Sequence, residues 1–367
     1  MERDSGEIGK KPRRGAGRRR LPGGLWLLLG LGLGAGLWFW LAGGGMEGGG
    51  LGGVSPDELW RRLLRPLGRT LVFVSAGLLV GQLLEGLGLS ARLGVLARPL
   101  MRLAHLPPEA GTAFTAAFAS GVAANTLLFT SWREGRLDNR QLILANILNA
   151  SLPAYFLHLP TTFFVVYALL GRAALYYFGL TLLAALLRCA GVVLASRWWL
   201  PPGGEAAAAG ARPRPPWPEL WADTRRKFLT RLRRLLLIVV PVYLVVFWLS
   251  HSGFFDWLGR RAAGLVSESV LPVKAMSVVV FSVVAEFTSG FAAAGALLQS
   301  GGLGLKQVVM ALLIGNLVAT PVRALRHQVP HYMGIYSPKT GVKLLAIGQA
   351  VRVASVLVVL LLYAWMG

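Results

Sequence analysis

The sequence is poor in charge and in cysteine, and both shortages narrow the class of protein. Charged residues make up 15% of the chain, whereas about a quarter is usual in soluble domains, and hydrophobic residues reach 54%. The single cysteine, Cys189, lies inside an apolar run, which argues against a disulfide framework and a cysteine-based metal site. Water is therefore not expected to be the main solvent of this chain.

Sequence motifs that carry catalysis are also missing. The sequence has no Gly-x-x-x-x-Gly-Lys loop, no His-Glu-x-x-His and no Gly-x-Ser-x-Gly, and only 16 of its residues are acidic. Residues 48–53 match a dinucleotide fingerprint by letter, but no strand pattern precedes them, so we interpret them as a spacer. We predict no enzyme activity, no catalytic residue, no cofactor and no metal site.

The net charge of +22 is concentrated outside the apolar runs. Basic clusters that flank membrane spans follow the positive-inside rule, so we expect both clusters to be cytoplasmic. This pattern indicates that the partner is the lipid bilayer of the cell inner (plasma) membrane and not nucleic acid. The sequence leaves open whether the protein forms a homo-oligomer. The clusters are Lys10, Lys11, Arg13, Arg14, Arg18, Arg19 and Arg20, and Arg225, Arg226, Lys227, Arg231, Arg233 and Arg234.

The apolar runs predict an all-α, polytopic transmembrane helical bundle. A helix needs about 20 residues to cross about 30 Å of hydrocarbon, and lipid requires every backbone amide to be satisfied within its own segment. The expected spans are 70–87, 110–132, 142–156 and 173–194 in a first set, and 235–249, 273–298, 308–322 and 342–365 in a second.

Composition divides the chain into six segments. A basic N-terminus and a signal-anchor helix are followed by a Gly-rich link with an interfacial amphipathic helix, and a Pro- and Ala-rich basic linker separates two repeats. The boundaries are 1–20 for the N-terminus, 21–43 for the anchor, 44–68 for the link and amphipathic helix, 69–199 for the first repeat, 200–230 for the linker and 231–367 for the second repeat.

The two sets of spans resemble one another. Residues 118–124 read Phe-Ala-Ser-Gly-Val-Ala-Ala and residues 287–293 read Phe-Thr-Ser-Gly-Phe-Ala-Ala, and the spacing from Ser120 to His158 equals that from Ser289 to His327. Duplicated halves are usual in secondary transporters, with the substrate site near the midplane between them. We expect inverted copies with broken or re-entrant helices; inversion requires a further crossing between Leu157 and Trp199, a stretch that Gly171-Arg172 interrupts.

Polar residues inside the apolar runs are the candidates for a substrate or ion site, because an unpaired polar group in hydrocarbon costs several kcal/mol. Each could equally serve as interhelical glue, but together they favour a shared polar site. Glu286 would bind a coupling cation or proton, or pair with Arg323 or Arg352. The set comprises Ser120, Asn125, Gln141, Asn146 and Asn149 from the first copy, and Glu286, Ser289, Gln307, Asn316, Arg323, Arg326, His327, His331 and Tyr332 from the second.

Two prolines are expected to break helices at this site. Pro153 and Pro321 each remove a backbone donor within an apolar run, and such breaks expose helix ends that bind ions or anionic groups in transporters. A kink made only for packing is the ordinary alternative. The polar cluster from Arg323 to Tyr332 could bind a phosphate or a nucleobase, or form a positively charged loop at the cytoplasmic face.

The Phe-x-Ser-Gly-x-Ala-Ala segments, and above all residues 326–341 (Arg-His-Gln-Val-Pro-His-Tyr-Met-Gly-Ile-Tyr-Ser-Pro-Lys-Thr-Gly), resemble the nucleoside recognition or Gate-domain membrane proteins. That family is related to concentrative nucleoside transporters, the membrane region of bacterial ferrous-iron transporters and spore maturation proteins. The resemblance covers about residues 70–365. It implies two Gate-like repeats and a transporter or permease for a nucleoside, an ion or another small solute. A non-transporting scaffold or accessory subunit, similar to the spore maturation proteins, is the alternative.

Overall fold

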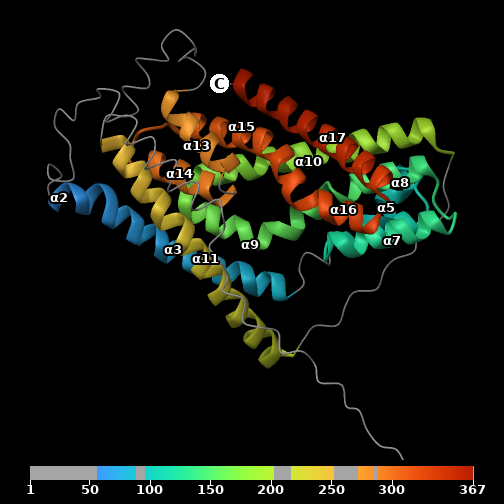
Figure 1. Ribbon diagram of the computed structural model, residues 1–367, viewed down its shortest axis with the longest axis horizontal. Coiled ribbons are helices and arrows are strands. Elements are labelled where there is room, and N and C mark those ends of the chain that lie inside the picture. Colours follow the sequence, from blue (N-terminus) through green and yellow to red (C-terminus); the bar gives the residue numbers. More distant parts are fainter. Residues whose placement is uncertain (1–55, 88–95, 202–215, 252–271, 285–286, 367) are drawn as a thin grey trace, which may run out of the picture.

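The computed structural model describes residues 56–87, 96–201, 216–251, 272–284 and 287–366. These residues form helices and turns without any strand, which confirms the all-α prediction (Figure 1). The predicted anchor at 21–43 and the candidate Glu286 lie outside the described residues. The helices are α2 (Pro56–Leu59), η2 (Trp60–Leu64), α3 (Arg65–Gly86), α5 (Ala97–Leu103), α6 (Pro108–Ala117), α7 (Gly121–Arg133), α8 (Asn139–Asn149), α9 (Leu152–Leu170), α10 (Arg172–Trp199), α11 (Trp217–His251), α13 (Val273–Val284), α14 (Phe287–Gln299), α15 (Leu305–Arg323), η4 (Ala324–Gln328), α16 (Val329–Ile335) and α17 (Pro338–Trp365).

Four helical segments in the described residues are long and apolar enough to cross a bilayer. They are Asn139–Leu170, which joins α8 to α9, and then α10, α15 and α17. Many large apolar side chains on α10 and α17 face outward, which suits a lipid-facing surface. The chain is therefore a membrane protein built from transmembrane helices.

Two runs of helices, α6 to α10 and α13 to α17, correspond to the two predicted repeats and are called here the first and the second copy. Helices α7 and α14 both have 13 residues, and α10 and α17 both have 28. The turn after the second helix is the same in each copy: Gly135 and Gly301 both adopt φ +74°, a left-handed conformation that glycine accepts without strain. The two residues after each glycine donate their amides to one carbonyl, that of Ser131 or of Leu297.

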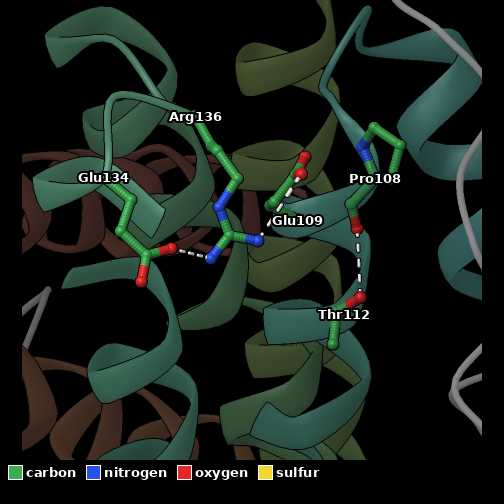
Figure 2. Close-up of polar contacts among 5 residues, drawn as sticks. All are labelled: Pro108, Glu109, Thr112, Glu134 and Arg136. Carbon is green, nitrogen blue, oxygen red and sulfur yellow. Dashed lines mark hydrogen bonds and ion pairs between the residues drawn. The ribbon is translucent and has the colours of Figure 1, made fainter. Parts of the chain in front are cut away.

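Helices α6 and α7 form a hairpin that returns to the side from which it starts. Glu109, in the first turn of α6, approaches Arg136, just beyond α7, at 3.9 Å, and Arg136 also pairs with Glu134 (Figure 2). In the same first turn, Thr112 donates to the Pro108 carbonyl at 3.2 Å. Helices of 10 and 13 residues span about 15–20 Å each, too short to cross alone.

The single spans expected at 110–132 and 273–298 are therefore wrong, because each region contains two short helices. The sequence of an apolar run of this length does not distinguish one helix that crosses the membrane from two helices that fold back on each other. A hairpin ends on the side where it begins, so the first copy has one membrane crossing fewer than we expected. Inversion therefore no longer needs the additional crossing that we expected between Leu157 and Trp199. That stretch contains only the remainder of α9 and α10, separated at Gly171 with φ +54°.

Equivalent helices of the two copies run in opposite directions. Figure 1 shows that α10 and α17 lie antiparallel: the C-terminal end of α10 is near the N-terminal end of α17. The two helices contact each other, and each also contacts the other copy, α10 against α15 and α17 against α8. An inverted repeat requires this antiparallel direction of its last helices, and the inversion of the whole repeat stays a prediction.

One pairing between the copies and two of the predicted segment boundaries need correction. Ser120 precedes α7 as its N-cap, whereas Ser289 lies inside α14, so the two Phe-x-Ser-Gly motifs are not at equivalent positions. The boundaries at 68/69 and 230/231 also fall inside continuous helical segments, since helix runs from Pro56 to Gly86 and from Trp217 to His251. The boundaries were misplaced because the polar composition at one end of each helix resembles that of a separate segment.

Candidate solute cavity between the two copies

A cavity of about 290 Å³ lies between the two copies of the repeat. Its wall comes from α7, α8 and α9 of the first copy, from α15, η4 and α16 of the second, and from α10 and α17 where they meet. Its lining residues on α10 and α17 are near the middle of 28-residue helices, which places the cavity at about mid-membrane depth. The polar side chains in the wall are Asn125, Asn146, Asn149, Ser151, Tyr155, His158, Thr181, Arg188, Asn316, Gln328, Tyr332, Gln349 and Arg352.

A hydrogen-bonded network in the wall connects the two copies. Asn146, only 2% exposed, donates to the Asn125 side chain at 2.9 Å and accepts from the Tyr332 hydroxyl at 3.3 Å. The Tyr336 hydroxyl donates to the Asn125 backbone carbonyl at 3.1 Å. Burial raises the pKa of Tyr336, so its phenol remains a neutral donor. The network explains part of the polarity of the wall as structural.

Asn149 is placed differently from Asn146, although both are on α8. It lines the cavity, is only 7% exposed, and neither its amide nitrogen nor its amide oxygen has a hydrogen-bond partner among the described residues. Helix α8 ends at Asn149, and α9 begins at Leu152 with Pro153 in its first turn. The break follows from this proline, which is tolerated at the start of a helix but not in its interior.

On the other side of the cavity, α15 supplies Asn316. Its side-chain oxygen accepts from Arg323 at 3.1 Å and from Thr320 at 3.2 Å, so this amide is held by its own helix. Pro321 lies near the end of α15, and the chain then passes into the π-helical turn η4. A π-helical turn is a frequent feature of functional sites in helices.

Two arginines from the meeting helices also line the cavity. Arg188 of α10 is 9% exposed and donates from Nη1 to the Ser355 hydroxyl of α17 at 2.7 Å. Ser355 in turn donates to the backbone carbonyl of Arg352 at 2.8 Å. Next to them, Gln349 donates to Gln328 at 2.8 Å. The wall thus combines positive charge with amide groups.

Several predicted site residues have structural roles away from the cavity. Gln141 and Gln307 are helix caps: the side-chain oxygen of each accepts the backbone amide three residues earlier, both at 2.9 Å. Ser120 accepts from the Ala123 amide at 3.2 Å as the N-cap of α7. Ser289 is completely buried in α14 and does not line the cavity.

The C-terminal polar cluster does not act as one site. His327 and His331 are exposed and do not line the cavity, whereas Tyr332 does. Arg323 contacts Asn316 but is not itself part of the lining. The side chain of Arg326 lies outside the described set.

Sequence reasoning missed several lining residues, above all Arg188. Its signal was present, because a charged residue in the middle of the apolar run 173–194 is as costly there as Glu286 is in its own run. Gln349 carries a weaker form of the same signal, because it is a polar residue inside the apolar run 342–365, whereas the place of Gln328 and Tyr155 in the wall depends on how helices pack. In the described part of the chain, no group of three His, Cys, Asp or Glu residues is placed to hold a metal ion.

Comparison with known proteins gives relatives but no function. No protein-family model and no solved structure matches this chain. Three proteins of Methanocaldococcus jannaschii, all described as uncharacterized, are similar to it. MJ1556 is 25% identical over 289 residues, which is 76% of this chain and 88% of that protein. MJ0871 is 23% identical over 72% of this chain and 82% of its own length, and MJ0880 is 21% identical over 83% and 99%.

Proposed function

We propose that this protein is a multi-pass transporter of the inner (plasma) membrane that moves a small polar solute through the cavity between its two copies. The proposal agrees with the resemblance to the nucleoside recognition (Gate) family, which is related to concentrative nucleoside transporters and to the membrane region of bacterial ferrous-iron transporters. Secondary transporters of this architecture hold their substrate at the interface between inverted repeats, near the midplane.

The observation that carries the proposal is the cavity with the unpaired amide of Asn149 in its wall. A buried amide without a partner costs about 1–3 kcal/mol, so a scaffold would gain stability by replacing it with an apolar residue. Both amide atoms are covered in this arrangement, so a bound polar solute would supply the missing partners once the side chain turns toward the cavity. A repeat interface packed solid with Ala, Gly and Leu would have favoured the scaffold instead.

The short helices around the cavity support the same function. The hairpin α6–α7 places Gly121, the first residue of α7, in the wall, and the break between α8 and α9 places Asn149 and Ser151 there. Non-helical backbone at membrane depth is tolerated where it lines a water-filled cavity.

Uptake into proteoliposomes tests this function. Purified protein is first screened for solutes that raise its thermal stability, because a ligand bound only by the folded state stabilises it by mass action. Labelled forms of the stabilising solutes are then offered to proteoliposomes that contain wild type, Asn149→Ala or the control Thr126→Val, an exposed position of α7. We expect uptake by wild type and control and none by Asn149→Ala. Binding without uptake would favour the scaffold or accessory subunit.

A further inference from the structure

The cavity contains two positive charges at a depth where charge is costly. Arg188 and Arg352 both line it, and each is near the middle of its helix. An arginine at the centre of a membrane span is among the costliest residues to insert into a bilayer. A residue with this cost is a functional candidate by default, provided that its structural contacts do not already account for it.

Most N–H donors of the two guanidinium groups, those of Arg188 and Arg352, make no hydrogen bond to a described residue. A guanidinium has five N–H donors. Arg188 uses one on Ser355, while its Nε has no partner among the described residues. Among the described residues, the guanidinium of Arg352 makes no hydrogen bond and no ion pair, and only the backbone carbonyl of Arg352 accepts, from Ser355. The contact with Ser355 therefore explains how Arg188 is held but not why two guanidinium groups point into a shared cavity.

The remaining lining gives no negative charge to balance them. Of the residues that the structure describes, no Asp or Glu lines the cavity, and the other polar groups are amides, hydroxyls and one imidazole. Asn149 adds two N–H donors and a carbonyl oxygen without partners. A planar fork of N–H donors suits a carboxylate or a phosphate, since two parallel charge-assisted hydrogen bonds can form.

The size of the cavity limits the solute. A volume of about 290 Å³ corresponds to roughly ten water molecules at about 30 Å³ each. It is at the small end of ligand pockets, which hold about 300–1,000 Å³. The wall also has little exposed aromatic surface beyond Tyr155 and Tyr332.

From these observations, we infer that the solute is a small oxyanion of about ten non-hydrogen atoms or fewer, a carboxylate or a phosphate, held by Arg188 and Arg352 with Asn149 beside them. That the protein moves this anion across the membrane rests on the proposed function, but binding of the anion to the site can be tested without transport. The oxyanion supplies the acceptors that both guanidinium groups lack.

The test measures binding to the purified full-length protein by calorimetry and by thermal stabilisation. The probes are inorganic phosphate, succinate and a panel of small carboxylates and phosphate monoesters, each compared with an uncharged isostere such as succinamide for succinate. We expect at least one anion to bind at least tenfold more tightly than its isostere. Carboxylates and phosphates form separate arms, so the arm that responds identifies the class of oxyanion.

Variants connect the binding to the two side chains. Arg188→Gln and Arg352→Gln should each weaken the anion by tenfold or more, and Arg352→Lys should weaken it less because the charge is retained. Arg197→Gln is the matched control: it removes an exposed arginine near the end of the same helix, α10. A Gln variant whose fold is in question is replaced by its Lys variant, which must keep the preference for anions.

The outcomes for site and function are distinct. Anion binding that both Gln variants weaken, without uptake in proteoliposomes, would keep the anion site and remove the transport function. Uptake of an uncharged solute that is unchanged by either Gln variant would keep transport and overturn the anion site. Failure of every anion to stabilise the protein, or equal stabilisation by the isosteres, would also overturn it.

Discussion

The Tyr332 hydroxyl donates to the side-chain oxygen of Asn146 at 3.3 Å and so joins the second copy of the repeat to the first through the cavity wall. Asn146 in turn donates to the side chain of Asn125, and the Tyr336 hydroxyl donates to the backbone carbonyl of Asn125. These four residues connect the two copies through hydrogen bonds in the polar wall. Asn149, one turn further along α8, has no such partners.

Asn146→Ala should destabilise the protein. The change removes both hydrogen bonds of a buried amide and leaves Tyr332 and Asn125 with unmatched polar groups, which costs about 1–3 kcal/mol. Thermal unfolding of the detergent-solubilised protein measures the effect. Thr126→Val, which loses only a local bond to the Val122 carbonyl, should leave the midpoint nearly unchanged. Equal midpoints for wild type and Asn146→Ala would show that the network does not hold the wall.

Asn149→Ala should have the opposite effect on stability. No described residue pairs with this amide, so its removal relieves a buried unsatisfied group and the free energy of unfolding should stay the same or rise by about 1 kcal/mol. Solute binding should be lost at the same time. The pair of measurements separates function from folding, because a residue needed for packing would lose both. A large fall in the unfolding midpoint would assign Asn149 to the structure.

Gly295→Ala should destabilise the contact between α14 and α9. A Cβ atom at Gly295 would lie 2.9 Å from the backbone carbonyl oxygen of Leu169, which cannot move aside as a side chain can. Overpacking of this kind costs about 1–3 kcal/mol. The matched control is Gly179→Ala in α10, where nothing lies within 4 Å of the added methyl and helix propensity favours Ala by up to about 1 kcal/mol. Opposite shifts in unfolding midpoint are expected, and shifts of the same sign would contradict the packing.

The antiparallel arrangement of α10 and α17 predicts the sidedness of α17. Single cysteines replace the exposed Lys339 and Trp365, near its two ends, in a protein whose buried Cys189 has been changed to Ala. By the positive-inside rule, Lys339 and the basic linker after α10 should both face the cytoplasm. A membrane-impermeant maleimide added to intact cells should label position 365 and not position 339.

A reporter fused within residues 202–215 completes the topology test. It should report the cytoplasm, the same side on which position 339 is expected. Labelling of both cysteines from one side, or a reporter signal from the outer side, would contradict the inverted arrangement.

The sequence was sufficient for the helical class, because apolar runs are local patterns, whereas the duplication stays a prediction that the similar turns and helix lengths support. It was insufficient for the hairpin α6–α7, whose fold-back at residues 118–120 depends on packing between two short helices. In the cavity, Asn146 and Asn149 look alike in the sequence, yet one is paired and the other is not. The positions of Asn125, in the preceding helix, and of Tyr332, 186 residues away along the chain, decide between them.

The two copies are not identical where their long helices break. The first copy is interrupted between α8 and α9 at residues 150–151, whereas the second continues through the whole of α15 and loosens only at η4, residues 324–328. The cavity therefore meets a helix break at Asn149 and Ser151 on one side and a π-helical turn at Gln328 on the other, so the two copies do not make a symmetric wall.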